Sequence, residues 1–262
     1  MTGLDLGIEG RTALVCGSSR GLGRACAEAL ARAGVQVVLN GRDGEQLART
    51  AGEIADAIGR PIEAIAADVT TEAGRALLLE ACPDPDILVN NAGGPPPGSF
   101  EDWDEAQWQA AVGANMIAPI LLIRAVLPAM RAKGWGRILN ITSSAVKAPI
   151  PLLGLSNGAR AGLTGFVAGL ARQVARDGVT INNLLPGTFA TDRLKGYLGA
   201  VAKSQGVDEA EALRRTAAAN PTGRVGEPEE FGAVCAFLAS RHAGYITGQN
   251  ILQDGGAYPG VM

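Results

Sequence analysis

Apolar residues along the chain gather in short runs that alternate with longer stretches of helical spacing. The runs lie near residues 11–16, 35–40, 61–66, 86–90, 136–142, 179–185 and 247–253. Residues 35–39 and 87–89 are almost entirely apolar and rich in β-branched residues, as a strand covered on both faces requires. Strands that alternate with helices in this way form a parallel sheet with helices on both faces. The pattern therefore predicts an α/β fold.

A glycine-rich turn follows the first apolar run. Residues 16–23 read Cys-Gly-Ser-Ser-Arg-Gly-Leu-Gly and open an alanine-rich helical stretch. Glycines 17, 21 and 23 permit a tight backbone path, and they let a pyrophosphate approach the helix N-terminus, where free N–H groups favour negative charge. A purely structural turn can have the same composition. The turn indicates a nucleotide site only together with other signals.

Further motifs follow the later strands. They are residues 90–93 (Asn-Asn-Ala-Gly), 140–143 (Asn-Ile-Thr-Ser), 186–187 (Pro-Gly), 246–249 (Ile-Thr-Gly-Gln) and 254–256 (Asp-Gly-Gly). With the glycine turn, these motifs resemble in order and spacing the classical short-chain dehydrogenase/reductase family, especially its 3-oxoacyl-(acyl carrier protein) reductase-like members. The resemblance runs from about Leu6 to Gly256. It implies one domain over residues 1–262, a Rossmann-type doubly wound seven-stranded parallel sheet of order 3-2-1-4-5-6-7.

The resemblance also implies a dinucleotide, and the second strand indicates which one. An acidic side chain at the end of this strand accepts bonds from the ribose 2′-OH of NAD and repels a 2′-phosphate. Here that position is Gly41, followed by Arg42, and Arg20 lies in the glycine turn, where NADP users of the family often have a basic residue. Guanidinium groups bind phosphate bidentately. We therefore predict NADP, the alternative being that both arginines only pair with surface acids.

Other cofactor contacts are carried over from the family by position. Asp68 and Val69 resemble its adenine-contacting pair, and residues 91–93 would line the ribose and nicotinamide. The expected cofactor-binding residues are Gly17, Ser19, Arg20, Gly21, Leu22, Gly23, Gly41, Arg42, Asp68, Val69, Asn91, Ala92, Gly93, Pro186, Gly187 and Thr191.

The catalytic positions depart from the family pattern. Ketone-reducing members use an asparagine, a serine, a tyrosine and a lysine, and Asn115 and Ser143 match the first two by position. The tyrosine normally lies thirteen residues beyond the serine and the lysine four residues later, and these positions hold Ser156 and Arg160. A spacing of four on a helix places both side chains on one face, toward the crevice.

This departure changes the acid–base chemistry that is available. Hydride transfer to a carbonyl builds an alkoxide, which a phenol of pKa ~10, lowered by an adjacent ammonium, can protonate near neutral pH. The hydroxyl of Ser156 is far too weak an acid for this step. Arg160 can hold ribose hydroxyls, a carboxylate or an oxyanion, but it stays protonated and cannot relay a proton as lysine does.

Three functions remain open. The first is an NADP-dependent oxidoreductase acting on a carbonyl or hydroxyl of a small molecule or acyl thioester, such as a 3-oxoacyl compound; Ser143 and Ser156 orient the carbonyl, and water or Lys147 supplies the proton. The second is a non-redox lyase, dehydratase or isomerase in which Arg160 and Lys147 stabilise an enolate. The third is a catalytically silent nucleotide-binding protein.

Each candidate residue also has an ordinary structural interpretation. Lys147 would then be a solvated loop lysine, Ser143 a cap at the strand end, and Asn115 a structural asparagine, which in the family also holds a water. Tyr197 is the one tyrosine that we consider able to reach a substrate, although packing explains it as well.

Two further segments bear on the substrate and on assembly. Residues 188–226 contain two predicted short helices and by resemblance form the substrate lid, unless they are only a surface excursion. The helix predicted for residues 156–176 combines apolar positions with Gly165 and Gly169. In the family such a helix forms a subunit interface, so we expect a homodimer or homotetramer, although packing within one subunit explains the same pattern.

Composition excludes several classes of function. The chain has 23 basic and 26 acidic residues, a net charge of −3, which predicts no nucleic-acid partner. Residues 1–10 lack a basic start and an apolar leader, and no apolar run is judged long enough for a membrane span, so we expect a cytoplasmic protein. The single His242 and four separated cysteines predict no metal site; core packing is the expected role of Cys16, Cys26, Cys82 and Cys235.

Overall fold

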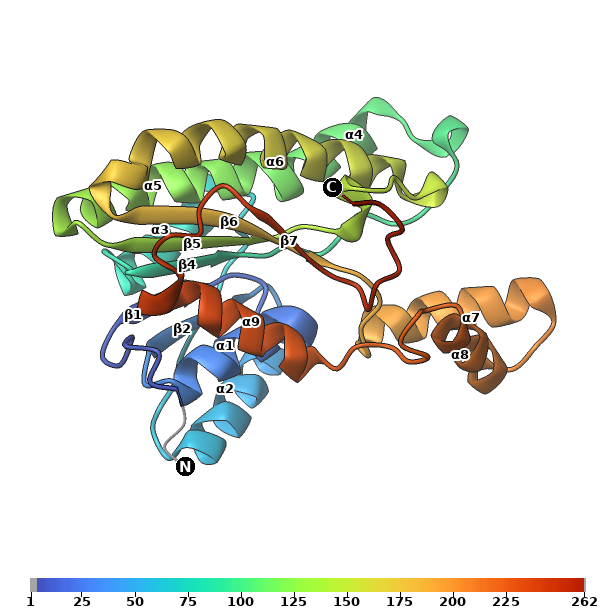
Figure 1. Ribbon diagram of the computed structural model, residues 1–262, viewed down its shortest axis with the longest axis horizontal. Coiled ribbons are helices and arrows are strands. Elements are labelled where there is room, and N and C mark those ends of the chain that lie inside the picture. Colours follow the sequence, from blue (N-terminus) through green and yellow to red (C-terminus); the bar gives the residue numbers. More distant parts are fainter. Residues whose placement is uncertain (1–3, 262) are drawn as a thin grey trace.

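A seven-stranded parallel sheet with helices on both faces forms the body of the protein, as a computed structural model describes it for residues 4–261 (Figure 1). The strands are β1 (Thr12–Val15), β2 (Gln36–Gly41), β3 (Glu63–Ala66), β4 (Ile87–Asn90), β5 (Gly136–Ile141), β6 (Val179–Pro186) and β7 (Asn250–Gln253). Their order is 3-2-1-4-5-6-7, which confirms the predicted fold. Residues 1–3, part of the segment used to predict localisation, lie outside the described residues.

The helices begin and end at residues suited to those positions. Asp43 and Thr71 each accept a hydrogen bond from a backbone N–H of the helix that follows, while Gly59 and Gly134 adopt the left-handed conformation at helix ends. The helices are α1 (Gly21–Arg32), α2 (Gly44–Ile58), α3 (Glu72–Ala81), α4 (Glu105–Val112), α5 (Ala118–Lys133), α6 (Gly154–Val174), α7 (Asp192–Gln205), α8 (Glu209–Ala218) and α9 (Pro228–Ala239), with short or irregular turns η1 (Phe100–Asp102), η2 (Gly113–Ile117), η3 (Ser144–Val146), η4 (Pro151–Leu153), η5 (Ala175–Asp177) and η6 (Arg241–Ala243).

Two hydrophobic layers form because successive side chains of a strand point to opposite faces of the sheet. Val89 lies in the layer covered by α1, α2 and α9, whereas its neighbour Leu88 lies in the layer covered by α3, α5 and α6. The four cysteines are buried in these layers as free thiols: Cys16, Cys26, Cys82 and Cys235.

A row of buried asparagines crosses the sheet near its carboxyl edge. Asn90, Asn140, Asn183 and Asn250 are aligned in register on β4, β5, β6 and β7. The amide N–H of Asn90 donates to Asn140 at 2.9 Å, that of Asn140 donates to Asn183 at 3.0 Å, and that of Asn183 donates to Asn250 at 2.8 Å. This asparagine ladder ties four strands together through side chains.

The expectation about membrane-length segments was wrong. A continuous helical run from Glu105 to Lys133, formed by α4, η2 and α5, is long and apolar enough to span a membrane by length and composition. Only 39% of its most apolar window is buried. One side contributes Leu122, Val126 and Met130 to the core, as the core helix of a globular domain does. Polar residues inside this run, such as Asn115 and Arg124, interrupt its apolar pattern in the sequence.

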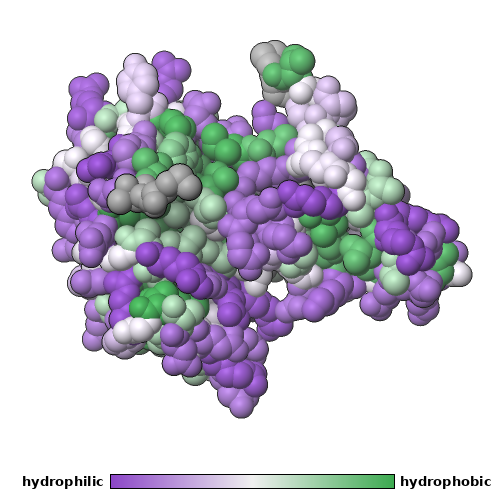
Figure 2. All heavy atoms as spheres, turned by 60° about the horizontal axis from the view of Figure 1, so that its bottom comes forward, coloured by the Kyte–Doolittle hydropathy of each residue, from purple (hydrophilic) through white to green (hydrophobic). Residues whose placement is uncertain are grey.

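The segment between β6 and α9 forms an arm that projects from the body (Figure 1). It contains two helices, α7 and α8, with a small core of Leu198, Ala202 and Ala212. A parallel bridge between Phe189 and Gly226 closes its base. On the face shown in Figure 2, hydrophilic residues surround apolar patches on the body, and apolar residues also lie where the arm joins the body.

The asparagine ladder should contribute measurably to stability. Asn140→Ala removes two hydrogen bonds and leaves the side-chain N–H of Asn90 and the side-chain oxygen of Asn183 without these partners, and each such buried group costs about 1–3 kcal/mol. The matched variant Asn250→Ala removes one bond at the half-buried edge strand. Urea unfolding should show a clearly larger loss for Asn140→Ala; equal losses would contradict a cooperative ladder.

Candidate active site

The carboxyl end of β5 carries the first candidate catalytic side chain. Ser143 follows the strand by two residues and begins the short turn η3, where its Oγ accepts a hydrogen bond from the N–H of Ala145 at 3.1 Å. The capping role considered from the sequence is therefore present. It leaves the hydroxyl hydrogen of Ser143 free to donate, because capping uses only the oxygen lone pair.

Ser156 and Arg160 lie one turn apart on α6 and point to the same strand end. Ser156 is 3% and Arg160 7% exposed. The Nε–H of Arg160 donates to Ser156 Oγ at 3.2 Å, and its Nη1–H donates to the carbonyl oxygen of Ile141 at 2.7 Å. Since Ile141 is the last residue of β5, these bonds fix the guanidinium beside the strand that precedes Ser143.

The positive charge of Arg160 is not neutralised by a carboxylate in the described part of the chain. Among residues 4–261 it forms no ion pair with a carboxylate, and Nη2 makes no hydrogen bond. Burial, and to a smaller extent the positive charge of Arg193, lower the pKa of Arg160 to about 10. The guanidinium therefore remains protonated at neutral pH, and it is available to an anion or to the oxygen of a bound molecule.

Asn115 lies in η2, a π-helical turn between α4 and α5. Its amide N–H donates to the carbonyl of Ala111 at 3.2 Å, while its buried side-chain carbonyl oxygen has no partner within the described chain. Wider π turns are frequent at functional sites. The free oxygen can accept a hydrogen bond from water or from a ligand.

Lys147 lies at the end of η3, and its ammonium is 5.8 Å from the ring centre of Tyr258. The sequence reading considered Tyr197, which is 56% exposed on α7, and overlooked Tyr258. No signal in the sequence could have found Tyr258, because it lies more than a hundred residues from Lys147 in a segment without regular structure.

The glycine turn after β1 has a shape that only glycine permits. Gly17 and Gly21 have φ of +55° and +58°, in the left-handed region. A Cβ on Gly23 would collide with the carbonyl oxygen of Gly17, and that same oxygen accepts a bond from the side-chain N–H of Asn91 at 2.9 Å. Asn91 therefore holds the turn itself, a role the sequence reading did not foresee.

The cationic residues expected near a 2′-phosphate are free. Gly41 approaches Ser19, with only 3.2 Å between its ideal Cβ and that of Ser19, so a larger side chain at 41 would crowd the turn. Arg20 and Arg42 are exposed, and neither makes a hydrogen bond or ion pair with residues 4–261. The nearby acid Glu53 pairs instead with Arg24, at 2.5 Å. The structure therefore does not show the alternative, in which both arginines pair with surface acids.

The remaining predicted cofactor residues lie along the same edge of the sheet. Asp68 follows β3, and bonds from the N–H and hydroxyl of Thr70 lower the pKa of its carboxyl, with a smaller contribution from Arg42. Thr191 precedes α7 and approaches the glycine turn, 3.6 Å from the ideal Cβ position of Gly21. Ala92 and Gly93 follow β4, Pro186 ends β6, and the N–H of Gly187 donates to Gln253 at 2.8 Å. Val69 adjoins Asp68, Leu22 lies in α1, and neither has a contact that assigns it a role.

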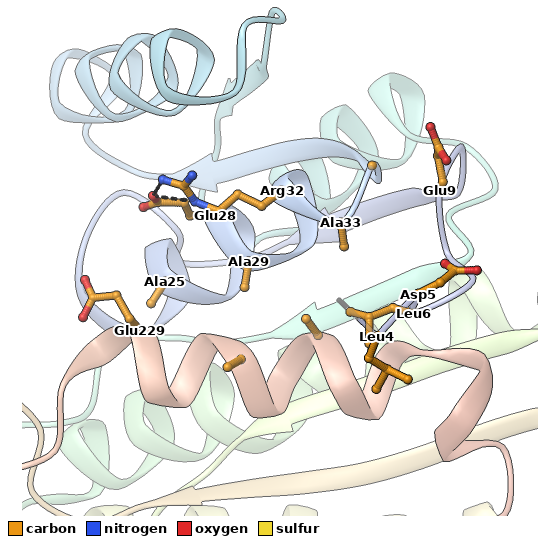
Figure 3. A pocket seen from close by; sticks show the side chains of 13 residues that line it. Leu4, Asp5, Leu6, Glu9, Ala25, Glu28, Ala29, Arg32, Ala33 and Glu229 are labelled. Atoms are coloured by element: carbon orange, nitrogen blue, oxygen red, sulfur yellow. Dashed lines mark hydrogen bonds and ion pairs between the residues drawn. The ribbon is translucent and has the colours of Figure 1, made fainter. Parts of the chain in front are cut away.

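A cavity of about 680 Å³ lies elsewhere, between α1, α9 and the N-terminal segment (Figure 3). Alanines of α1 form one wall, and carboxylates such as Glu28, which pairs with Arg32, lie at its rim. None of the predicted site residues lines it. Within residues 4–261, no three His, Cys, Asp or Glu side chains are grouped as metal ligands.

The tight turn gives a direct test of the nucleotide cradle. Gly23→Ala places a methyl group against the Gly17 carbonyl, and overpacking of this kind typically costs about 1–3 kcal/mol. Gly52→Ala on α2 is the matched control, because nothing lies within 4 Å of its Cβ and alanine favours a helix. Thermal unfolding should show a loss for Gly23→Ala alone; equal behaviour of the two variants would contradict the geometry.

Comparisons with known proteins agree with this arrangement. A family profile described as enoyl-(acyl carrier protein) reductase matches residues 17–258. The chain is 35% identical to 3-oxoacyl-[acyl-carrier-protein] reductase of Vibrio cholerae, covering 97% of the chain and 99% of that protein. It is 32% identical to D-beta-hydroxybutyrate dehydrogenase of Rhizobium meliloti, covering 94% and 98%.

Solved structures show the same likeness. L-sorbose reductase from Gluconobacter frateurii, complexed with NADPH and L-sorbose, superposes with a TM-score of 0.93 at 30% identity, covering 98% of this chain and all of that one. The positions matched by the family profile extend from the glycine turn after β1 to beyond β7, so they include the loops at the carboxyl edge of the sheet. The chain belongs to the short-chain dehydrogenase/reductase family of oxidoreductases.

Proposed function

We propose that this protein is a cytoplasmic NADP(H)-dependent oxidoreductase that acts on a carbonyl or hydroxyl group of a small molecule or acyl thioester, such as a 3-oxoacyl compound. The observation that carries the proposal is the meeting of Ser143, Ser156 and Arg160 at the end of β5, on the sheet edge that also bears the glycine turn. NADPH bound to the related L-sorbose reductase supports the cofactor assignment.

The residues present fit this cofactor. Gly23, whose missing side chain lets it pack against the Gly17 carbonyl, keeps the turn tight, and Arg20 and Arg42, unpaired among residues 4–261, offer two guanidinium groups for the 2′-phosphate. Reduced nicotinamide, when bound, supplies a hydride to a carbonyl carbon. The chain's own residues must hold the carbonyl, stabilise the negative charge on its oxygen and deliver a proton.

We assign these roles by position. Ser156 and Arg160 occupy the places where ketone-reducing relatives have tyrosine and lysine. The free hydroxyl hydrogen of Ser143 donates to the carbonyl oxygen, and the protonated Arg160 stabilises the negative charge that develops there. A water held by the unpaired oxygen of Asn115, or the ammonium of Lys147, supplies the proton.

A non-redox lyase, dehydratase or isomerase is the second candidate. Its support is the same buried guanidinium, since a cation beside a carbonyl stabilises an enolate as well as an alkoxide. Loss of nicotinamide absorbance across a panel of carbonyl compounds separates the two functions. A lyase assay on β-hydroxy carbonyl compounds then separates the second candidate from a silent nucleotide-binding protein.

We further propose a homodimer or homotetramer that uses the outer face of α6. Gly165 and Gly169 have nothing within 4 Å of their ideal Cβ positions, and the side chain of Phe166 between them is 36% exposed. Nearby Ile117 of η2 is 42% exposed. Close helix packing needs small residues beside apolar ones, and light scattering of the purified protein measures the mass directly.

The cofactor assignment is tested by Arg42→Ala. Losing a charge-assisted contact to the 2′-phosphate should weaken NADPH binding by roughly ten- to a hundredfold, while NADH affinity stays nearly unchanged. Arg24→Ala, which removes the pair with Glu53 on a neighbouring surface, is the control and should leave both affinities as they are. Equal affinities of the unmodified protein for NADPH and NADH would refute the assignment.

The altered catalytic positions are tested by the double replacement Ser156→Tyr with Arg160→Lys. Restoring a phenol beside an ammonium should raise carbonyl reduction by about 10²- to 10⁴-fold, the usual contribution of general acid catalysis. NADPH affinity measured on the same variant shows that it is folded. If the unmodified protein reduces ketones rapidly and the double variant is inactive, then Ser156 and Arg160 support a different working mechanism.

A further inference from the structure

A second arginine faces the same region as Arg160. Arg193 is the second residue of α7, at the base of the arm, and its guanidinium lies directly against Gly94 in the loop after β4. Among residues 4–261 it makes no hydrogen bond or ion pair. The residue as a whole is exposed, whereas its guanidinium is surrounded by enough protein for burial to lower its pKa.

The position of Arg193 depends on a glycine. A Cβ on Gly94 would overlap the guanidinium, so the close contact requires that residue 94 have no side chain. Gly94 comes directly after Gly93, one of the residues expected to line the nicotinamide end of the cofactor. The arm, which follows β6, therefore places the positive charge of Arg193 against the loop after β4.

Two guanidinium groups so arranged repel each other. Arg193 lies against the loop after β4 and Arg160 is bonded to the end of β5, and these neighbouring parallel strands place both groups at one edge of the sheet. The charge of Arg193 accordingly contributes to the lowered pKa of Arg160. A buried, unpaired charge is costly, and a second like charge nearby adds to that cost. Some other arginines pair with acids, as Arg224 does with Glu230 at 2.7 Å. An arrangement with this cost is stabilised when an anion binds between the two groups.

The cofactor does not supply the anion that would bind between Arg160 and Arg193. Its phosphates belong with the glycine turn and with Arg20 and Arg42, and its ribose hydroxyls are neutral. Arg160 is bonded to the strand end beside Ser143, where the reacting carbon must lie if the proposed function holds. The anion must then come from the molecule that is being oxidised or reduced.

We propose that Arg160 and Arg193 bind an anionic group of the substrate, a carboxylate, beside its reacting carbonyl or hydroxyl, so that the substrates are oxo acids and hydroxy acids. The redox part of this statement rests on the function proposed above. The inference narrows that function, because a 3-oxoacyl thioester carries no charge next to its keto group.

The test compares an acid with its isosteric neutral amide. Isothermal titration of the NADP⁺-saturated protein with 3-oxobutanoate and with 3-oxobutanamide measures binding without turnover, because an oxo compound and oxidised cofactor cannot react. Pairs of 2-oxo and 4-oxo acids and amides are measured in the same way. In at least one pair the acid should bind roughly ten- to a hundredfold more tightly than the amide, the ratio expected for a charge-assisted contact.

Three variants locate the anion. Arg193→Gln should remove the preference for the acid. Gly94→Ala should weaken it, because the new methyl group displaces the guanidinium without removing its charge. Lys195→Gln is the matched control, since Lys195 is on the same helix, 79% exposed and pairs with Asp192, and it should leave acid binding unchanged. Unfolding temperatures of all three variants show whether they are folded.

Other results for acid binding overturn the inference. Equal binding of acids and amides by the unmodified protein, or no binding of either at the solubility limit, shows that no substrate anion is held here. A loss of NADPH affinity in Arg193→Gln with acid binding intact assigns Arg193 to the cofactor pyrophosphate. If NADP⁺ does not bind at all, the proposed function fails separately, and an acid–amide difference measured without cofactor still supports the anion site.

Discussion

Parallel pairing of all seven strands is the constraint on which the site depends. Because every strand runs the same way, all their carboxyl ends meet at one edge. Residues after β1 (Gly17), β4 (Asn91), β5 (Ser143) and β6 (Gly187) therefore line one crevice although long stretches of chain separate them. The helices fill the two faces, and side chains with chemistry are left for the loops at this edge. Local sequence has only to supply suitable residues after each strand.

Features that depend on neighbouring residues in the sequence could be predicted, and contacts between residues far apart in the sequence could not. The strands and the glycine turn depend on periodicity and on backbone freedom within a few residues, so their patterns are visible in the sequence. The pairing of Asn90 with Asn140 depends on strand register, and the contact of Arg193 with Gly94 on how the arm folds back. Neither is encoded nearby in the chain. The π turn at Asn115 was likewise not predicted, because it is defined by a backbone hydrogen-bond pattern that no residue type in this segment signals.

The distribution of charge connects the fold with its chemistry. The chain carries a net charge of −3, yet its crevice is cationic. Some surface arginines are neutralised locally, as Arg215 is by Glu211 at 2.8 Å. Arg20 and Arg42 at one end of the crevice and Arg160 at the other have no such partner among residues 4–261. These unpaired cations favour anionic ligands at this edge of an otherwise acidic protein.

The asparagine ladder has a consequence for how the sequence can change over time. Each interior asparagine satisfies two neighbours at once, so a single substitution leaves buried amides exposed to the full desolvation cost. Replacing several members together by apolar residues of similar shape avoids that cost. Single substitutions at these positions therefore destabilise the protein and should be rare. Related chains should keep the whole row or lose adjacent members jointly, and these codons should covary across strands that are distant in the gene.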